Sequence, residues 1–171
     1  MISFEEVQPG LEIARGAFRQ EALTIVEDVL KSPEDEWSNR GDRDILVEAN
    51  GSDLVTKRAF MSLRSIADQL LEGDVRGLFT RYRPGEHGGW HEDMDWMVPV
   101  HVLSLLDIEE PVFEYQTGEP QYCDGIKMDP TDDVASLTLS AGDILRVNRY
   151  DLTHRGLNPT DEYRYIGVFS R

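Results

Sequence analysis

The sequence contains a single cysteine, Cys123, among its 171 residues. One cysteine permits neither an internal disulfide nor a zinc site built from several thiolates, which fits a reducing compartment. No apolar run approaches the ~20 residues that a membrane-spanning helix requires. The first residues, MISFEEVQPG, lack the basic flank and the apolar stretch of a signal peptide. We therefore expect a cytoplasmic protein that does not enter a membrane.

Basic residues are also scarce, with 17 Lys and Arg against 33 Asp and Glu and a net charge of −16. A field of this sign repels nucleic acid and anionic membranes unless the basic residues cluster locally. Nucleic acid is thus an improbable partner. The acidic surplus is better explained by solubility or a salty environment than by a specific cationic partner.

Nothing in the chain suggests more than one domain, because it has no internal repeat, no low-complexity tract and no Ser/Gly-rich linker. Its length is sufficient to bury roughly 70% of the unfolded surface in one core. We expect a single domain over residues 1–171, with helical support in residues 1–74 and a β core in residues 75–171. The oligomeric state is not indicated by the sequence.

Two segments of the first half carry apolar residues at helical spacing. Residues 19–32 are ended by Ser32-Pro33, and residues 61–74 by Gly73, the usual residue after a helix. The spacing therefore predicts a helix in each segment. The apolar positions are Leu23, Val26, Val29 and Leu30 in the first segment and Leu63, Ile66 and Leu70 in the second.

From about Val75 onward, short β-type runs alternate with turn residues. Helices followed by antiparallel strands predict an α+β fold, with helices packed on one face of a β-sandwich or jelly roll. The predicted strands lie within residues 75–82, 97–108, 112–116, 135–140, 143–150 and 163–171.

The segment YRPGEHGGWHEDMDW, residues 82–96, concentrates candidate metal ligands. Pro84-Gly85 and Gly88-Gly89 make a helix improbable, which excludes a helical zinc site built on His87 and His91. In an extended chain, His91 and Asp93 point to one side and Glu92 to the other. An imidazole and a carboxylate, completed by a distant histidine, form a triad that leaves open positions on ferrous iron. In such an acid-rich chain the pair is a weak signal without a third ligand.

The C-terminal segment offers that ligand. His154 is predicted at the end of a strand, and residues 156–162 resemble a hairpin connection to the final strand, which carries Arg164. The planar guanidinium of Arg164 can bind a carboxylate through two parallel hydrogen bonds, as an anchor for 2-oxoglutarate would require. The plainer alternative is a structural His154 and a surface Arg164.

In combination, these residues resemble the iron(II)/2-oxoglutarate-dependent oxygenases, and the prolyl-hydroxylase type most of all. The resemblance rests on Tyr82-x-x-Gly85, then His91-x-Asp93, then Gly142-Asp143, and covers residues 79–170. It continues with His154-Arg155 and, ten residues after His154, with Arg164-Tyr165.

The resemblance implies a double-stranded β-helix, a jelly roll with the metal inside its mouth. It implies that His91, Asp93 and His154 bind Fe(II), that Arg164 holds the distal carboxylate of 2-oxoglutarate, and that Tyr82 places its hydroxyl on the same co-substrate. It further implies O2-dependent hydroxylation of a small molecule or a protein side chain, with release of succinate and CO2. The three metal ligands, His91, Asp93 and His154, would form the catalytic centre.

The sequence departs from the family pattern in the middle strands. Many relatives have a Gly-Gly-Glu-like stretch where this chain reads EEPVFEYQTGE, with Phe113 and Tyr115 at inward apolar positions. The substrate assignment suffers most from this difference. The following segment, residues 116–135, is expected to be a loop near the mouth, either a lid or a plain surface loop.

Several neighbours of the motif have open roles. Trp90, Met94 and Trp96 are either core residues or an apolar substrate wall. Arg146, Arg149 and Arg155 either make the mouth locally positive or pair with nearby carboxylates, whereas His87 and His101 are expected to be structural or to support the ligands.

Two other functions remain open. One is an oxidative demethylase of alkylated nucleic-acid bases, which resembles the same superfamily. Those enzymes carry a further arginine six residues beyond the 2-oxoglutarate arginine, where this chain has Ser170 and then Arg171. The net charge also disfavours nucleic acid. The other is a non-catalytic jelly-roll binding protein.

Overall fold

The structure is a computed structural model that describes residues 2–171. The structure contains two α-helices and is otherwise built mainly of strands, which confirms the predicted α+β class. The helices are α1 (Arg19–Val29) and α2 (Leu54–Ala67), with short 3-10 turns η1 (Glu34–Glu36), η2 (Glu48–Asn50) and η3 (Asp95–Met97). Neither helix combines the length and the apolar character that crossing a membrane requires within the described residues.

Eight strands form the main sheet, in the order β1-β2-β11-β6-β13-β5-β4-β3. Its neighbouring strands are all antiparallel. In chain order these strands are β1 (Glu5–Gln8), β2 (Leu11–Ala14), β3 (Ser38–Asn39), β4 (Arg43–Val47), β5 (Arg76–Tyr82), β6 (Val100–Ser104), β11 (Ile144–Val147) and β13 (Arg164–Ser170).

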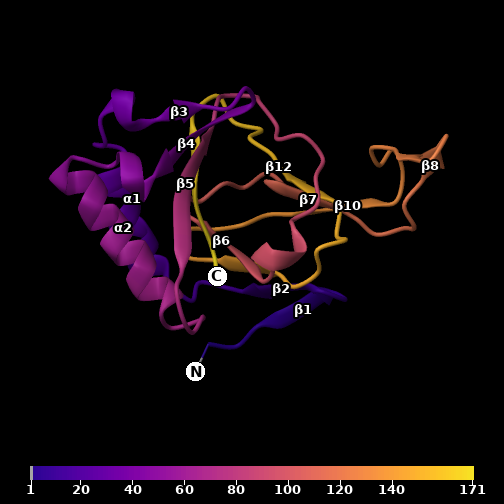
Figure 1. Cartoon of the computed structure of the whole chain (residues 1–171), viewed down its shortest axis with the longest axis horizontal. Helices are drawn as coiled ribbons and strands as arrows, with labels where there is room; N and C mark the ends of the chain where they lie inside the picture. Colours follow the sequence, from indigo (N-terminus) through magenta and orange to yellow (C-terminus); the bar gives the residue numbers. More distant parts are fainter. Residues whose placement is uncertain (1) are drawn as a thin grey trace.

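A second sheet has three strands in the order β10-β7-β12, and it faces one side of the main sheet (Figure 1). Its strands are β7 (Phe113–Gln116), β10 (Val134–Leu137) and β12 (His154–Gly156). Between β7 and β10 the chain forms a separate two-stranded ribbon, β8 (Tyr122–Cys123) with β9 (Ile126–Lys127), which projects away from the body.

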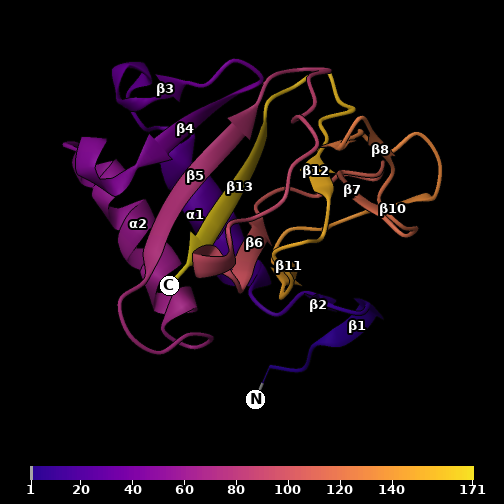
Figure 2. The ribbon, with the colours of Figure 1, turned by 45° about the vertical axis from the view of Figure 1, so that its right-hand side comes forward.

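Alternation along the strands divides the molecule into two apolar layers. On β13, Tyr165 and Phe169 point toward the helices, whereas Arg164 and Ile166 point into the space between the sheets. The helices cover the outer face of the main sheet (Figure 2), where Leu63 of α2 lies against the backbone of β13. The inter-sheet space is therefore lined by alternate residues of the central strands, and it contains the candidate site.

The bounds of one of the two helices differ from the range predicted from the sequence. α1 lies within the predicted segment, but α2 begins at Leu54, seven residues earlier than residue 61, and ends at Ala67. The Asp53 carboxylate caps α2 by accepting a hydrogen bond from the Val55 N–H at 2.7 Å. Gly73 adopts a positive φ of 95° in the turn after α2, not directly at the helix end.

All six predicted strand segments contain a strand. The four strands that precede residue 74 were not visible as a pattern, because β1 to β4 have two to five residues each. Such short strands depend on their neighbours in the sheet rather than on local preference. The first part of the chain thus builds both edges of the main sheet in addition to the helices.

Candidate metal centre

The segment after β5 runs antiparallel to β12 and to the residues that follow it, and backbone hydrogen bonds hold the two together. The Gly88 N–H donates to the Gly156 carbonyl at 2.9 Å, and the Gly85 N–H donates to Thr160 at 3.0 Å. Asn158, fully buried, donates through its side-chain amide to the carbonyls of Arg83 and Glu162 at 2.8 and 2.7 Å. Glycine at these positions allows the two chains to approach closely.

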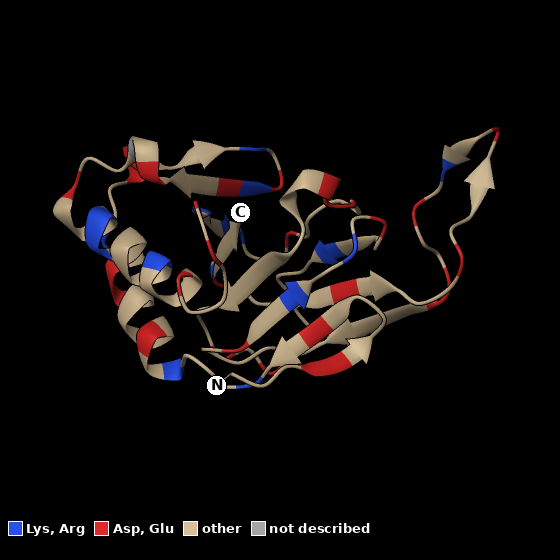
Figure 3. Ribbon diagram, turned by 60° about the horizontal axis from the view of Figure 1, so that its bottom comes forward, with Lys and Arg blue, Asp and Glu red and all other residues tan. Residues whose placement is uncertain are grey.

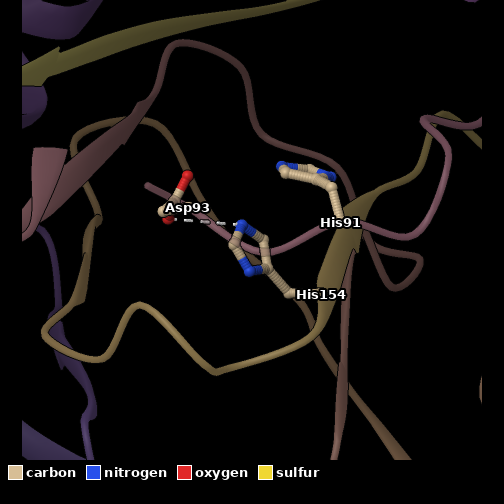
Figure 4. A group of neighbouring side chains, drawn as sticks. All are labelled: His91, Asp93 and His154. Carbon is tan, nitrogen blue, oxygen red and sulfur yellow. Dashed lines mark ion pairs between the residues drawn. The ribbon is translucent and has the colours of Figure 1, made fainter. Parts of the chain in front are cut away.

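This pairing brings His91, Asp93 and His154 together. Each offers one ligand atom, and these three atoms lie within 4.8 Å of one another. The side chains converge on a common space, as Figure 4 shows, with His154 Nε2 3.7 Å from Asp93 Oδ2. His154 is the first residue of β12 rather than the end of the preceding strand as predicted.

Both histidines present the same ring nitrogen to that space. The Nδ1 atoms of His91 and His154 lie 2.9 Å from the backbone carbonyls of Gly89 and Leu152, respectively. Since a carbonyl oxygen only accepts, each Nδ1 carries a proton, which makes Nε2 the ring nitrogen that can coordinate a metal. This arrangement, in which the second nitrogen donates to a carbonyl, is typical of metal-ligating histidines.

The protonation states also suit a metal ion. Burial, followed by the neighbouring His91, lowers the pKa of His154, so its imidazole is neutral at physiological pH. Asp93 Oδ2 is buried and has no hydrogen-bond partner. An unpartnered buried carboxylate oxygen is costly in a folded protein, and a cation between it and two imidazoles would satisfy it. The donor set of two nitrogens and one oxygen therefore fits a divalent metal with open positions.

Glu92, between the two ligands, also contributes to the wall of the cavity, but its carboxylate is engaged by groups outside the triad. Its carboxylate pairs with Lys127 of the β8–β9 ribbon and accepts a hydrogen bond from Thr153 at 3.2 Å. The residues between the candidate ligands thus fix the segment from outside, and Glu92 is not available as a ligand.

Arg164 lies deeper in the same space and is only 1% exposed. Nη1 donates to the Leu157 carbonyl at 2.8 Å, whereas Nε has no partner and no carboxylate of the described residues pairs with the guanidinium. Burial lowers the pKa of Arg164 to about 10, so the group remains charged at neutral pH. A buried cation without a counter-charge is rare and points to an anionic ligand.

Tyr82 lies directly opposite Arg164 on the neighbouring strand β5. Its ring centroid is 5.4 Å from the guanidinium carbon of Arg164. Burial raises the pKa of the Tyr82 phenol, which therefore stays protonated and can donate a hydrogen bond. A Cβ on Gly156 would lie 2.5 Å from the Tyr82 hydroxyl, so the glycine makes room for this side chain.

A cavity of about 430 Å³ connects the triad with Arg164 and Tyr82. Apart from these polar groups its walls are mainly apolar, which is the usual character of a small-molecule site. The walls include Leu78, Val100, Val102, Phe113, Ile166 and Val168 from the facing strands, Met94 and Met97 at the rim, and Arg40 and Arg43 from the β3–β4 hairpin.

Sequence reasoning missed four contributors to the site: Gly156, Asn158, Arg40 and Arg43. The Asn-Pro pair at 158–159 indicated only a turn, although Asn158 fixes the end of β5 from which the metal segment departs. Arg40 and Arg43 are distant in sequence from every motif residue, and only the sheet order brings them to the cavity.

The remaining candidates have structural surroundings. Trp90 lies under the guanidinium of Arg155, 4.5 Å from its centre, and Trp96 is 59% exposed, whereas Met94 lines the cavity. The three arginines whose role was open all pair with acids: Arg146 with Glu12, Arg149 with Asp151 and Arg155 with Glu114. His87 bridges to Leu157, and His101 is buried on the outer face of β6, stacked on Phe169.

No family model and no curated protein matches the chain in a comparison of sequences. Solved structures do match over most of its length. HygX from Streptomyces hygroscopicus, with nickel and 2-oxoglutarate bound, aligns with a TM-score of 0.65 at 14% identity, over 94% of this chain and 81% of that one. The epimerase SnoN, in complex with Fe3+, alpha-ketoglutarate and nogalamycin RO, gives 0.62 at 14%, over 94% and 78%.

A prolyl hydroxylase from Trichoplax adhaerens is similar to the same extent. It was solved with a peptide of hypoxia inducible factor and aligns with a TM-score of 0.65 at 16% identity, over 94% of this chain and 82% of that one. The chain therefore has the fold of the iron/2-oxoglutarate-dependent oxygenases, prolyl hydroxylases among them, as its motifs suggested.

Proposed function

We propose that the protein is an Fe(II)- and 2-oxoglutarate-dependent dioxygenase that hydroxylates a small molecule or a protein side chain and releases succinate and CO2. The observation that carries this proposal is the buried, uncompensated guanidinium of Arg164 in the same cavity as the His91, Asp93 and His154 triad. A metal site alone would not require a buried cation, whereas a dicarboxylate co-substrate would.

In this proposal the two facing sheets are a double-stranded β-helix, and residues 1–171 form one catalytic domain. His91, Asp93 and His154 hold the metal through two Nε2 atoms and one carboxylate oxygen. Three ligands on one side leave positions for the keto acid of 2-oxoglutarate and for O2. Iron bound there would supply the oxygen activation that is driven by oxidative decarboxylation of the co-substrate.

Arg164 and Tyr82 would bind the other end of 2-oxoglutarate. The Leu157 carbonyl holds one nitrogen of the guanidinium, which orients the remaining N–H groups toward the cavity. Arginine can grip a carboxylate through two hydrogen bonds, and the protonated Tyr82 hydroxyl can add a third. The anchored co-substrate would thereby be aligned with the metal before substrate arrives.

The apolar walls would exclude water from the oxidation and direct one C–H bond of the substrate to the metal. Hydroxylation is our preferred outcome, although the same fold supports an epimerase in SnoN. The net charge of −16 favours a substrate other than nucleic acid, and the single exposed Cys123 is compatible with a cytoplasmic location.

Two measurements test the proposal. Calorimetric titration of the nickel-loaded protein with 2-oxoglutarate should give one site, and the metal-free protein should bind the co-substrate far more weakly. With Fe(II), 2-oxoglutarate and air, succinate should accumulate as 2-oxoglutarate is consumed. A protein that binds nickel but not 2-oxoglutarate would contradict the proposal and would favour a non-catalytic binding function.

A further inference from the structure

The rim of the cavity carries a second cationic site, distinct from Arg164. Arg40 and Arg43 of the β3–β4 hairpin line the cavity together with Met94 and Met97. A role for these two arginines in substrate binding rests on the proposed function, since it assigns them to the substrate of the same centre.

Strand register places Arg43 two strands away from Arg164. Arg43 lies opposite Tyr82, and Tyr82 lies opposite Arg164, so the three residues form a row across β4, β5 and β13. With neighbouring strands ~4.8 Å apart, the Cα atoms of Arg43 and Arg164 are about 10 Å apart. The two carboxylates of 2-oxoglutarate would be taken by Arg164 and by the metal, which leaves Arg40 and Arg43 free for another anion.

Hydrogen bonds attach the β3–β4 hairpin to the segment that carries His91 and Asp93. Asp42 accepts a hydrogen bond from the Gly89 N–H at 3.2 Å, and Arg83 donates to the Gly41 carbonyl at 3.1 Å. Figure 1 shows the β3–β4 turn at the same end of the molecule as the chain that leaves β5. Because of these contacts, a ligand held by the hairpin would also lie beside the triad.

The acidic and basic residues of the β3–β4 hairpin do not balance fully at this rim. Acidic residues occur on strands, helices and loops alike (Figure 3), and the basic residues around the two sheets mostly pair with them, as Arg155 does with Glu114. Arg43 pairs with Asp42 at 3.0 Å, but Arg40 has no acidic partner among the described residues. The hairpin therefore presents a net charge of about one positive unit to the opening.

A single positive charge beside several carboxylates favours a monoanion. Glu92 and Asp93 line the same cavity, so a doubly charged phosphate would meet more repulsion than a carboxylate. Met94, which is 59% exposed, and Met97 add apolar surface to the same cavity. Methionine side chains adapt to varied apolar shapes.

We propose that the substrate is a small monocarboxylic acid with an apolar chain. Its carboxylate binds to Arg40 and Arg43, and its apolar part lies along Met94 and Met97 over the triad. The distance between the hairpin and the metal then selects which carbon of the chain is oxidised, because the carboxylate fixes one end of the substrate.

The test compares acids with their neutral amides in protein loaded with nickel and 2-oxoglutarate. The probes are hexanoate against hexanamide and 3-phenylpropanoate against 3-phenylpropanamide, with affinities measured by ligand-observed NMR. Each acid should bind about ten-fold more tightly than its amide or better, since charge-assisted hydrogen bonds are lost in the amide. In the double variant Arg40→Gln/Arg43→Gln this preference should disappear.

The matched control is Arg64→Gln/Arg76→Gln, which makes the same change in charge away from the cavity and should keep the preference. Equal affinities of acids and amides in the unmodified protein would overturn the proposal. Weaker 2-oxoglutarate binding in the Arg40→Gln/Arg43→Gln variant would also overturn it, because the arginines would then serve the co-substrate. The acids and amides are also compared in metal-free protein. The preference for acids does not require 2-oxoglutarate, whereas the proposed function does, so a failure of one can be told from a failure of the other.

Discussion

His91 and His154, 63 positions apart in the chain, are joined by a reciprocal pair of backbone hydrogen bonds. The His91 N–H donates to the His154 carbonyl at 3.0 Å, and the His154 N–H donates back at 2.9 Å. The two rings lie with their centroids 4.4 Å apart. The backbone, not the side chains, therefore sets the spacing of these two candidate ligands.

Asp93→Ala should abolish turnover and metal binding while the metal-free protein stays folded. The replaced Oδ2 atom is buried without a partner, so its removal costs no hydrogen bond and relieves a desolvated charge. Thermal unfolding with and without nickel measures this: the variant should match or exceed the metal-free parent and gain nothing from the metal. The control Asp95→Ala, an exposed acid two residues away, should retain the metal-induced shift. A variant that is still stabilised by nickel would remove Asp93 from the ligand set.

Arg164→Lys tests the co-substrate anchor separately from the metal. Lysine keeps the charge but loses the paired N–H groups, so 2-oxoglutarate affinity should weaken roughly ten- to a hundred-fold. Nickel affinity should not change. Calorimetry of the two ligands gives both values, with Arg76→Lys at the far end of β5 as the control. Unchanged 2-oxoglutarate binding would place the carboxylate anchor elsewhere.

Gly156→Ala should weaken 2-oxoglutarate binding through Tyr82. The added methyl group would lie 2.5 Å from the Tyr82 hydroxyl and 2.8 Å from the ring carbon that bears it, so the ring must move into the cavity. Overpacking of this kind costs about 1–3 kcal/mol, which corresponds to roughly five- to 150-fold in affinity if the bound state carries the whole cost. Gly89→Ala is the matched control, because a Cβ there has no atom within 4 Å. If both variants bind the co-substrate equally well, Tyr82 does not contact it.

The stability of the protein should depend on His101 in mildly acidic solution. Burial, and next the charge of Arg146, lower the pKa of His101 from 6.5 to about 4 in the folded chain. Between these values the unfolded chain binds one more proton, so the free energy of unfolding should rise with pH, by about 3 kcal/mol in all. Denaturant unfolding at pH 5 and pH 6.5 should show this slope, and His101→Leu should reduce it.

Carboxylates also make the free energy of unfolding rise with pH, but at lower pH than His101 does. They therefore set the lower end of the pH range in which that experiment reports on His101. Hydrogen bonds, that from Thr56 first, hold the pKa of Glu36 at about 2, so its contribution is lost as the pH falls from 4.5 toward 2. Above pH 6.5 the parent and His101→Leu should have parallel curves. An undiminished slope between pH 5 and 6.5 in the variant would mean that His101 is protonated in the folded chain.

The local pattern of the sequence determined most of the elements that are long enough to show a period, although it placed the start of α2 seven residues too late. α1 and the seven-residue strands β5 and β13 follow from apolar spacing, and the glycines around His91 excluded a helix there. Such features depend on side-chain alternation and on backbone preference, which act over a few residues. The candidate ligands were also recognisable, because their residue types and order carry a chemical requirement.

Only the tertiary structure decided which of these residues share a site and what surrounds them. The motif pattern singled out Arg164, but no local pattern shows that it is buried without a counter-charge whereas Arg155 pairs with Glu114. The same holds for Arg40 and Arg43, brought to the cavity by the order of β4, β5 and β13. Burial and ion pairing result from contacts between segments far apart in the chain, so the cavity and its charges emerge only when the sheets face each other.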